Sequence, residues 1–256
     1  MAQDTQLAGK TAFVAGGSSG INLGIAKRFA AAGANVVLIS RSQEKIEAAA
    51  KEVSTFGKPA IGIAVEAALK RTFDEFGPID IVLSGAAGNF VASALGMSAN
   101  GFKTVVDIDL IGTFNVLRAS FEFLRRPGAS LISITAGQAE RASLFQAHVC
   151  AAKAGINMLT KCLALEWGPA GVRVNAISPG PIADTEGMAR LATTPEAEAR
   201  VKERNPLRRY GTKDEIADMA LFLSSDQAAY VNGAIVPVDG GSGAGDASGN
   251  ALANYA

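Results

Sequence analysis

The sequence predicts an α/β protein in which a parallel β-sheet is covered by helices on both faces. Short runs rich in β-branched residues alternate with longer, alanine-rich runs of helical periodicity, and this alternation is typical of repeated βαβ units. The run 35–40 (NVVLIS) is apolar at its four central positions, as expected for a strand that is buried on both faces. A chain of 256 residues has the length of one domain.

The strands are predicted from short β-branched and apolar runs that are bounded by glycine or polar residues. The first of them leads into a glycine-rich turn, and the last precedes a pair of glycines. In chain order, we predict strands at 11–16, 35–40, 58–64, 79–83, 130–135, 172–178 and 234–238.

The helices are predicted from apolar residues that recur with helical spacing between these strands. Gly33 closes the first helix and Ser42 caps the second, because glycine is favoured after a helix and serine before one. In chain order, we predict helices at 21–32, 43–55, 65–77, 99–124, 145–167 and 213–224.

We expect a single domain over residues 1–256, with a tail at 240–256 that is rich in Gly, Ala and Ser and has little structure of its own. One junction is unusual, because the strand that ends at Ala64 meets a helical pattern at Val65 without turn residues. Such a connection normally needs a few residues of loop. Either the chain has a true deletion here or residues are missing between the two elements, and we favour the second interpretation.

The composition excludes several classes of function. Twenty-four basic and twenty-four acidic residues balance, so charge gives no reason to expect a nucleic acid or a membrane surface as partner. His148 is the only histidine, and Cys150 and Cys162 are the only cysteines, which argues against a metal site. The sequence shows neither a signal peptide nor a long apolar span, and the ending NYA is not a peroxisomal address. We therefore expect a cytoplasmic protein.

A glycine-rich loop, VAGGSSGINLGIA, joins the first predicted strand to the first helix. Glycines at this place let backbone N–H groups approach a pyrophosphate at the helix N-terminus. Asn22 stands where a third glycine would be expected, and Asn tolerates left-handed backbone. A tight turn without a ligand is the alternative, which the buried strand before the loop disfavours. The predicted cofactor contacts in the loop are Gly16, Ser18, Ser19, Gly20 and Ile21.

The end of the second predicted strand favours NADP(H) over NAD(H). A carboxylate at this place would bind a ribose 2′-hydroxyl and repel a 2′-phosphate. The run ISRSQEK has no acidic residue at the strand end but has Arg41, Ser42 and, one helical turn later, Lys45. Arginine can bind a phosphate through two parallel hydrogen bonds. A solvated arginine without a ligand is the alternative interpretation.

In these motifs and in several others, the chain resembles the short-chain dehydrogenase/reductases over nearly its whole length. The resemblance rests on the glycine loop, SGAAGNF after the fourth strand, Lys153, RVNAISPGPIADTEG after the sixth strand and VDGG near the end. It implies a single-domain, Rossmann-type doubly wound fold and a homotetramer. It also implies further cofactor contacts at Ala86, Lys153, Pro179, Gly180, Pro181, Ile182 and Thr185.

The sequence departs from the family's general pattern at the catalytic positions. The catalytic tyrosine position is Val149, the serine falls at about Ala136, and the helix asparagine falls at Asp109. These departures, together with GNF, DID before GTFN, His148 and TEG, are similar to the peroxisomal-type 2,4-dienoyl-CoA reductases. That branch implies an acyl-CoA substrate in fatty acid metabolism, with substrate contacts at Phe90, Ser98, Asn100 and Arg190. The family's adenine-contacting aspartate belongs in the short junction after Ala64 and is absent from it.

The chemistry of this branch does not need the missing phenol. A ketone reductase must protonate a carbonyl oxygen, which Val149 cannot do. Reduction of a dienoyl thioester instead needs an oxyanion stabiliser and a proton source. Asp109 is the predicted proton path, through a water, because a carboxylate on an apolar helix stripe is costly to ionise. Lys153 is the second predicted catalytic residue, and the alternative for Asp109 is a structural cap.

We therefore predict an NADPH-dependent oxidoreductase that reduces a 2,4-dienoyl-CoA. Two alternatives remain open. One is a reductase of 3-oxoacyl thioesters or other ketones, and the other is a catalytically silent NADP-binding subunit. We expect His148 to be a satisfied core or interface residue, because a regular helix would place it about 140° from Lys153.

Overall fold

The computed structural model describes residues 5–57, 60–64 and 68–249. In this part of the chain, one sheet has seven strands, and every pair of neighbours is parallel. The strands are β1 (Thr11–Ala15), β2 (Asn35–Ser40), β3 (Ile61–Ala64), β4 (Ile81–Ser84), β5 (Ser130–Ile134), β6 (Arg173–Pro179) and β7 (Ile235–Val238). Each predicted strand is present: β2 has the predicted bounds, and the ends of the others differ from the prediction by at most three residues.

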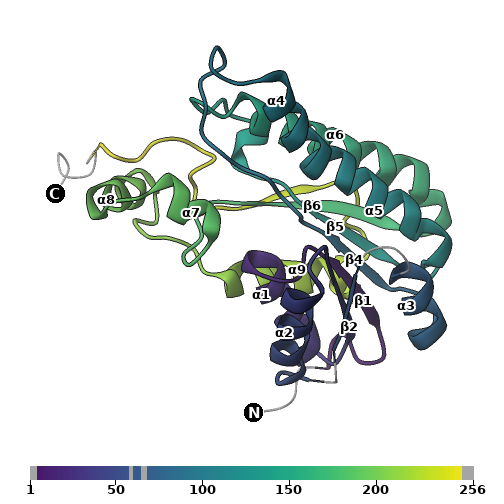
Figure 1. Cartoon of the computed structure of the whole chain (residues 1–256). Coiled ribbons are helices and arrows are strands. Elements are labelled where there is room, and N and C mark those ends of the chain that lie inside the picture. Colours follow the sequence, from purple (N-terminus) through teal and green to yellow (C-terminus); the bar gives the residue numbers. More distant parts are fainter. Residues whose placement is uncertain (1–4, 58–59, 65–67, 250–256) are drawn as a thin grey trace.

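Nine α-helices connect or follow these strands in the described residues (Figure 1). They are α1 (Gly20–Ala31), α2 (Gln43–Ser54), α3 (Ala68–Phe76), α4 (Ala99–Val106), α5 (Gly112–Ser120), α6 (Ala147–Trp167), α7 (Glu186–Leu191), α8 (Pro195–Arg204) and α9 (Lys213–Ser224). The sequence patterns predicted all of them except α7, which has only six residues, and α8, which is strongly polar.

Two apolar layers hold the helices against the sheet. On one face, Ile25 of α1, Ile46 of α2 and Ile216 of α9 are fully buried in one core cluster. On the other face, Leu117 of α5 and Leu163 of α6 belong to a second cluster. Figure 1 shows the two groups of helices on opposite sides of the sheet. The predicted doubly wound fold is therefore confirmed.

The strand order β3-β2-β1-β4-β5-β6-β7 reverses direction between β1 and β4. Sheets of this kind bind ligands at the carboxyl ends of the strands beside such a reversal. The loops after β1 and β4 touch there, since a Cβ on Gly16 would lie 2.9 Å from the Ala86 nitrogen. The topology thus brings the glycine loop and the segment after β4 to one edge of the sheet.

The predicted helix at 99–124 is not continuous. A π-helical turn at Asp107–Ile111 separates α4 from α5, and a short 3₁₀ turn follows at Phe121–Phe123. The unusual junction lies outside the described residues, because 65–67 are not described. Residues 240–249 contain turns and no helix or strand.

Candidate active site

The N-terminus of α1 is built to receive an anion. Ser19 is its N-cap residue but makes no side-chain capping bond, and the first turn holds no acidic residue. The first N–H groups of a helix have no partner within it, so they face outward here. Gly16 and Gly20 have φ angles of +77° and +61°, and nothing lies within 4 Å of a Cβ built on Gly20. These backbone groups fit the pyrophosphate of a dinucleotide.

Asn22 has a different role from the one expected. It lies inside α1 with helical backbone rather than in a left-handed turn, and its side chain is buried. Its amide nitrogen donates to the carbonyl oxygens of Ala15 at 3.4 Å and Gly16 at 3.3 Å. The side chain also lies against Gly85, where a Cβ would approach it to 2.4 Å. Asn22 therefore holds the glycine loop in place through its side chain, and its backbone is helical.

The carboxyl end of β2 lies beside this loop, because the N–H groups of Gly16 and Gly17 both donate to the Ile39 carbonyl. Arg41 follows at once and is exposed, as is Lys45. The Ser42 hydroxyl accepts from the Lys45 backbone N–H at 3.4 Å and so caps α2. The structure thus places the predicted 2′-phosphate contacts together, next to the predicted pyrophosphate site.

Asp109 and Lys153 lie next to each other at the carboxyl end of β5, and both are buried. Oδ1 of Asp109 accepts from the Gly88 N–H at 2.6 Å, while Oδ2 lies 3.2 Å from Lys153 Nζ. That ion pair lacks the angles of a hydrogen bond, so Oδ2 keeps an unsatisfied acceptor. Lys153 Nζ donates to the Ile134 carbonyl at 3.1 Å. The two predicted catalytic side chains therefore form one buried pair.

The π-helical turn sets the direction of Asp109. Widening one turn changes which side chains share a face, so the wheel of a regular helix is only partly correct. Val105 and Thr113 are buried beside Asp109, but Phe102, which a regular helix would place on the same stripe, is 40% exposed. Asp107 is exposed and pairs with Lys103. Such turns occur frequently at functional sites.

His148 is fully buried, and neither ring nitrogen makes a hydrogen bond of ideal geometry within the described residues, although the Phe90 backbone lies close enough to interact with the ring. Its ring lies 4.3 Å from that of Phe90, with an interplanar angle of 38°. Burial lowers the pKa of His148, while the Phe90 backbone and the charge of Asp109 act in the opposite direction. The expected core position is confirmed.

The predicted substrate residues lie on the segment between β4 and α4, at the start of α4 and on α7. Phe90 is partly exposed, and Ser98 caps α4 by accepting from the Gly101 N–H at 3.0 Å. Asn100 is exposed in the first turn of α4. Arg190 of α7 donates to the Asn89 carbonyl at 2.8 Å and pairs with Glu186. Arg190 and Phe90 thus come to neighbouring places from residues 100 positions apart.

The segment after β6 offers little free backbone. The Gly180 N–H donates to Val238, and the Pro181 carbonyl accepts from Gly211. Proline has no N–H, so the Ile182 N–H is the one donor left among residues 179–182. The Thr185 hydroxyl donates to the Ile182 carbonyl at 2.8 Å and caps α7, so its proton is already used within the protein.

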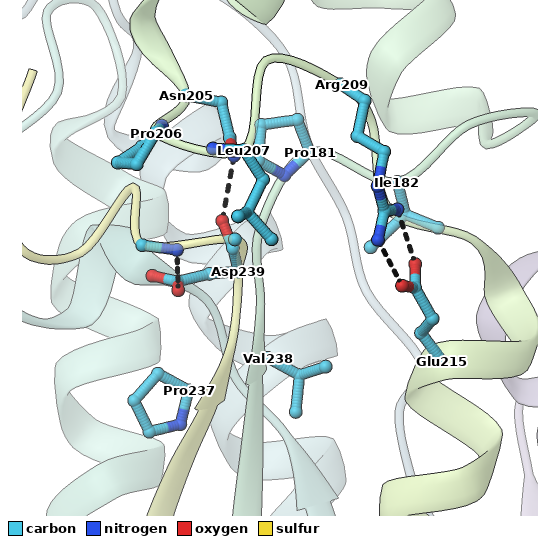
Figure 2. A pocket seen from close by; sticks show the side chains of 13 residues that line it. Pro181, Ile182, Asn205, Pro206, Leu207, Arg209, Glu215, Pro237, Val238 and Asp239 are labelled. Atoms are coloured by element: carbon cyan, nitrogen blue, oxygen red, sulfur yellow. Dashed lines mark hydrogen bonds and ion pairs between the residues drawn. The ribbon is translucent and has the colours of Figure 1, made fainter. Parts of the chain in front are cut away.

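A cavity of about 520 Å³ lies between this segment, the residues before α9 and the end of β7. Figure 2 shows Pro181 and Ile182 in its wall, together with the Arg209–Glu215 pair and the Asn205–Asp239 bond. None of the glycine loop, Asp109 or Lys153 lines it. The cavity therefore shares one wall with the predicted cofactor site but does not contain the catalytic pair.

Comparison with known proteins identifies the family. A family model described as enoyl-(acyl carrier protein) reductase matches residues 15–243. The peroxisomal 2,4-dienoyl-CoA reductase of Rattus norvegicus is 45% identical over 91% of this chain and 83% of its own length. A probable 2,4-dienoyl-CoA reductase of Bacillus subtilis is 38% identical over 91% of this chain and 96% of its own. The chain belongs to the short-chain dehydrogenase/reductase family.

A solved member of this family supports the same assignment. A short-chain dehydrogenase of Bacillus anthracis is 37% identical and superposes with a TM-score of 0.79, over 91% of this chain and 96% of that one. Within the described residues, no helix is both long and apolar enough to cross a membrane. The resemblance read from the sequence is therefore confirmed, as is the parallel sheet that it implies.

No tyrosine in the described residues takes the place of the family's phenol. Val149 is buried with Val105 and Ala152. The Tyr210 ring packs against Lys202 of α8, and Tyr230 is fully exposed. This short-chain reductase therefore has a carboxylate and a lysine, without a phenol, at its buried centre.

Proposed function

We propose that this protein is an NADPH-dependent reductase of 2,4-dienoyl-CoA thioesters. The observation that carries the proposal is the buried Asp109–Lys153 pair in a short-chain reductase whose phenol position is Val149. Relatives at 38% to 45% identity over most of the chain are named as 2,4-dienoyl-CoA reductases, and this supports the same substrate class.

The bound nicotinamide would supply a hydride to the δ-carbon of the conjugated thioester. The two double bonds then shift toward the carbonyl, and the negative charge collects on the thioester oxygen as a dienolate. A proton added at the α-carbon leaves one double bond between the β- and γ-carbons. Several of the relatives are named as (3E)-enoyl-CoA-producing, in agreement with this product.

Asp109 and Lys153 provide the protonation path. The free Oδ2 of Asp109 is the acceptor that would orient a water toward the α-carbon. Lys153 stabilises the charge of that carboxylate at 3.2 Å, and the Gly88 N–H fixes its other oxygen. The water would give one proton to the α-carbon, the Lys153 ammonium would return a proton to the hydroxide left behind, and solvent would then reprotonate Lys153. This path requires no phenol at the carbonyl oxygen.

Arg41, Ser42 and Lys45 support NADPH rather than NADH. Arg41 follows β2 directly and Lys45 lies in the first turn of α2; both are exposed, and Arg41 is not followed by a carboxylate until Glu44. The 2′-phosphate therefore meets positive charge beside the glycine loop. Phe90, Ser98, Asn100 and Arg190 are the proposed acyl-CoA contacts.

One assay tests the proposal against its two rivals. NADPH oxidation is followed with 2,4-hexadienoyl-CoA, with a 3-oxoacyl-CoA and with no acceptor. Turnover with the dienoyl thioester alone is the expected result. Turnover with the 3-oxoacyl thioester alone would establish a ketone reductase, and none with either would establish a silent binding subunit.

Assembly and location complete the proposal. We propose a homotetramer, supported by large apolar side chains that α5 and α6 expose, such as Phe114, Met158 and Leu165. Light scattering of the purified protein tests this, with a monomer as the contrary result. We also propose a cytoplasmic location, which cell fractionation tests.

A further inference from the structure

Loop 88–90, which follows β4, is held by polar groups that the proposed reaction does not use. Gln146 is 4% exposed, although it is the N-cap residue of α6 and has no capping bond. Its Nε2 donates to Asn89 Oδ1 at 3.2 Å, and its Oε1 accepts from Gln138 Nε2 at 3.1 Å. A buried amide with both ends bonded to side chains fixes its neighbours closely, because each broken bond would leave a buried polar group unsatisfied.

A second contact ties the same two segments. The Ala92 N–H donates to the Phe145 carbonyl at 3.1 Å. Phe145 has a φ of +63°, a conformation that is unfavourable for a bulky residue and persists only when its surroundings enforce it. The start of α6 is therefore held in an unusual conformation at the place where it bonds to the segment after β4.

Loop 88–90 carries the N–H group that holds Asp109. The Gly88 N–H lies one residue before Asn89 and donates to Asp109 Oδ1 at 2.6 Å. On the other side, the Asn89 carbonyl accepts from Arg190. Two consecutive residues therefore connect three parts of the protein: Gly88 bonds to the buried carboxylate, and Asn89 bonds to the start of α6 and to helix α7.

We propose that Gln146 is a positioning residue that acts through Asn89 and the Gly88 N–H to orient the Asp109 carboxylate. This inference rests on the proposed reduction of a dienoyl thioester, in which Asp109 directs the proton. Gln146 touches none of the reacting atoms, so its effect must pass through Asp109. Loss of its amide lets loop 88–90 move, and the carboxylate then loses its fixed direction.

The test uses Gln146→Met, which keeps the length of the side chain and removes both hydrogen bonds. We expect kcat with 2,4-hexadienoyl-CoA to fall about tenfold, as small misplacements of catalytic groups do, while the NADPH Kd stays within about twofold. Asn89→Ala removes the acceptor of the same bond and should lower kcat equally, with no further loss in the double variant. Gln227→Met, on an exposed residue of a 3₁₀ turn, is the matched control and should leave kcat unchanged.

A second background separates positioning from a general structural role. In Asp109→Asn, the Gln146→Met change should lower kcat no further, since the group through which it acts is already gone. Hydrogen exchange of the peptide at 85–92 should be faster in Gln146→Met than in wild type. A wild-type kcat in Gln146→Met, or the same loss in both backgrounds, would overturn the inference.

Failure of the proposed function gives a different result. If wild type does not turn over the dienoyl thioester, the reaction is wrong, and hydrogen exchange alone then decides the inference. Unchanged exchange at 85–92 in Gln146→Met would refute the positioning role whatever the substrate. Melting temperatures of all variants identify any that fail to fold, and Asn89→Ala then tests the bond from its other side.

Discussion

Lys153 Nζ lies 3.2 Å from Asp109 Oδ2, and the two groups come from helices on the same face of the sheet. Side chains from Asp109 and Lys153 are both buried, so neither charge can be screened well by water. Removing one partner would leave the other charge buried and unpaired, which is strongly unfavourable. This relationship makes the pair the first target for mutation.

Asp109→Asn should slow turnover far more than it weakens cofactor binding. We expect kcat to fall by about 10²-fold, the usual share of a proton-transfer group, with the NADPH Kd nearly unchanged. Asp107→Asn is the matched control, because Asp107 belongs to the same π-helical turn but faces solvent and pairs with Lys103. Steady-state kinetics and fluorescence titration measure both quantities, and near-normal turnover in Asp109→Asn would show that its assigned role is wrong.

Arg41→Ala should weaken NADPH selectively. A charge-assisted bond to phosphate contributes roughly 1.5–3 kcal/mol, so the NADPH Kd should rise about ten- to a hundredfold. NADH has no 2′-phosphate, and its Kd should stay the same. Arg71→Ala removes an exposed arginine of α3 and serves as the control. Equal losses for both nucleotides would contradict the assignment of Arg41 to the 2′-phosphate.

Asn22→Asp should loosen the glycine loop. The carboxylate cannot donate to the Ala15 and Gly16 carbonyls, which the Asn22 amide now satisfies. Unsatisfied buried acceptors cost about 1–3 kcal/mol each, so both the melting temperature and NADPH affinity should fall. Calorimetry and titration measure the two effects. A stable variant with normal affinity would mean that the loop keeps its shape without Asn22.

The Arg209–Glu215 pair at the start of α9 should make the stability of the protein depend on pH in the acidic range. The paired Arg209 guanidinium, assisted by the Thr212 backbone N–H, lowers the pKa of Glu215 to about 2. Because the folded pKa lies below the usual 4.5, the stabilisation is complete above pH about 4.5 and is lost as the pH falls toward 2.

Urea unfolding of Glu215→Gln tests this behaviour. Relative to wild type, the variant should lose about 1 kcal/mol or less at neutral pH, because the pair is largely exposed to solvent. The difference should shrink between pH 4.5 and pH 2. A difference that stays constant over this range would assign the stabilisation to the capping geometry alone.

The buried His148 should make the stability of the protein depend on pH in a second range, near neutrality. Burial lowers its pKa below the ordinary 6.5, so the unfolded chain binds the proton more readily than the folded one. Stability should therefore fall as the pH drops through 6.5. His148→Phe keeps a ring against Phe90 and should flatten the curve between pH 7.5 and pH 5.5. The comparison is clean because the chain has no other histidine.

The sequence alone was sufficient for the architecture, and it singled out two residues that the structure brings together. The spacing of apolar residues along a segment reflects how that segment is buried in the fold, and this spacing differs between strands and helices. The wheel of one helix placed Asp109 on a buried stripe, and the resemblance added Lys153. Both are buried, in one ion pair.

Only the tertiary structure showed how these residues are held. Asn22 bonds to Gly16, Gln146 to Asn89 and Arg190 to the loop after β4, and the last two of these contacts join residues 57 and 101 positions apart. The π-helical turn likewise interrupts the predicted helix at 99–124 without a mark in the local pattern. Polar contacts between distant segments depend on where the backbone passes, and local periodicity does not encode that path.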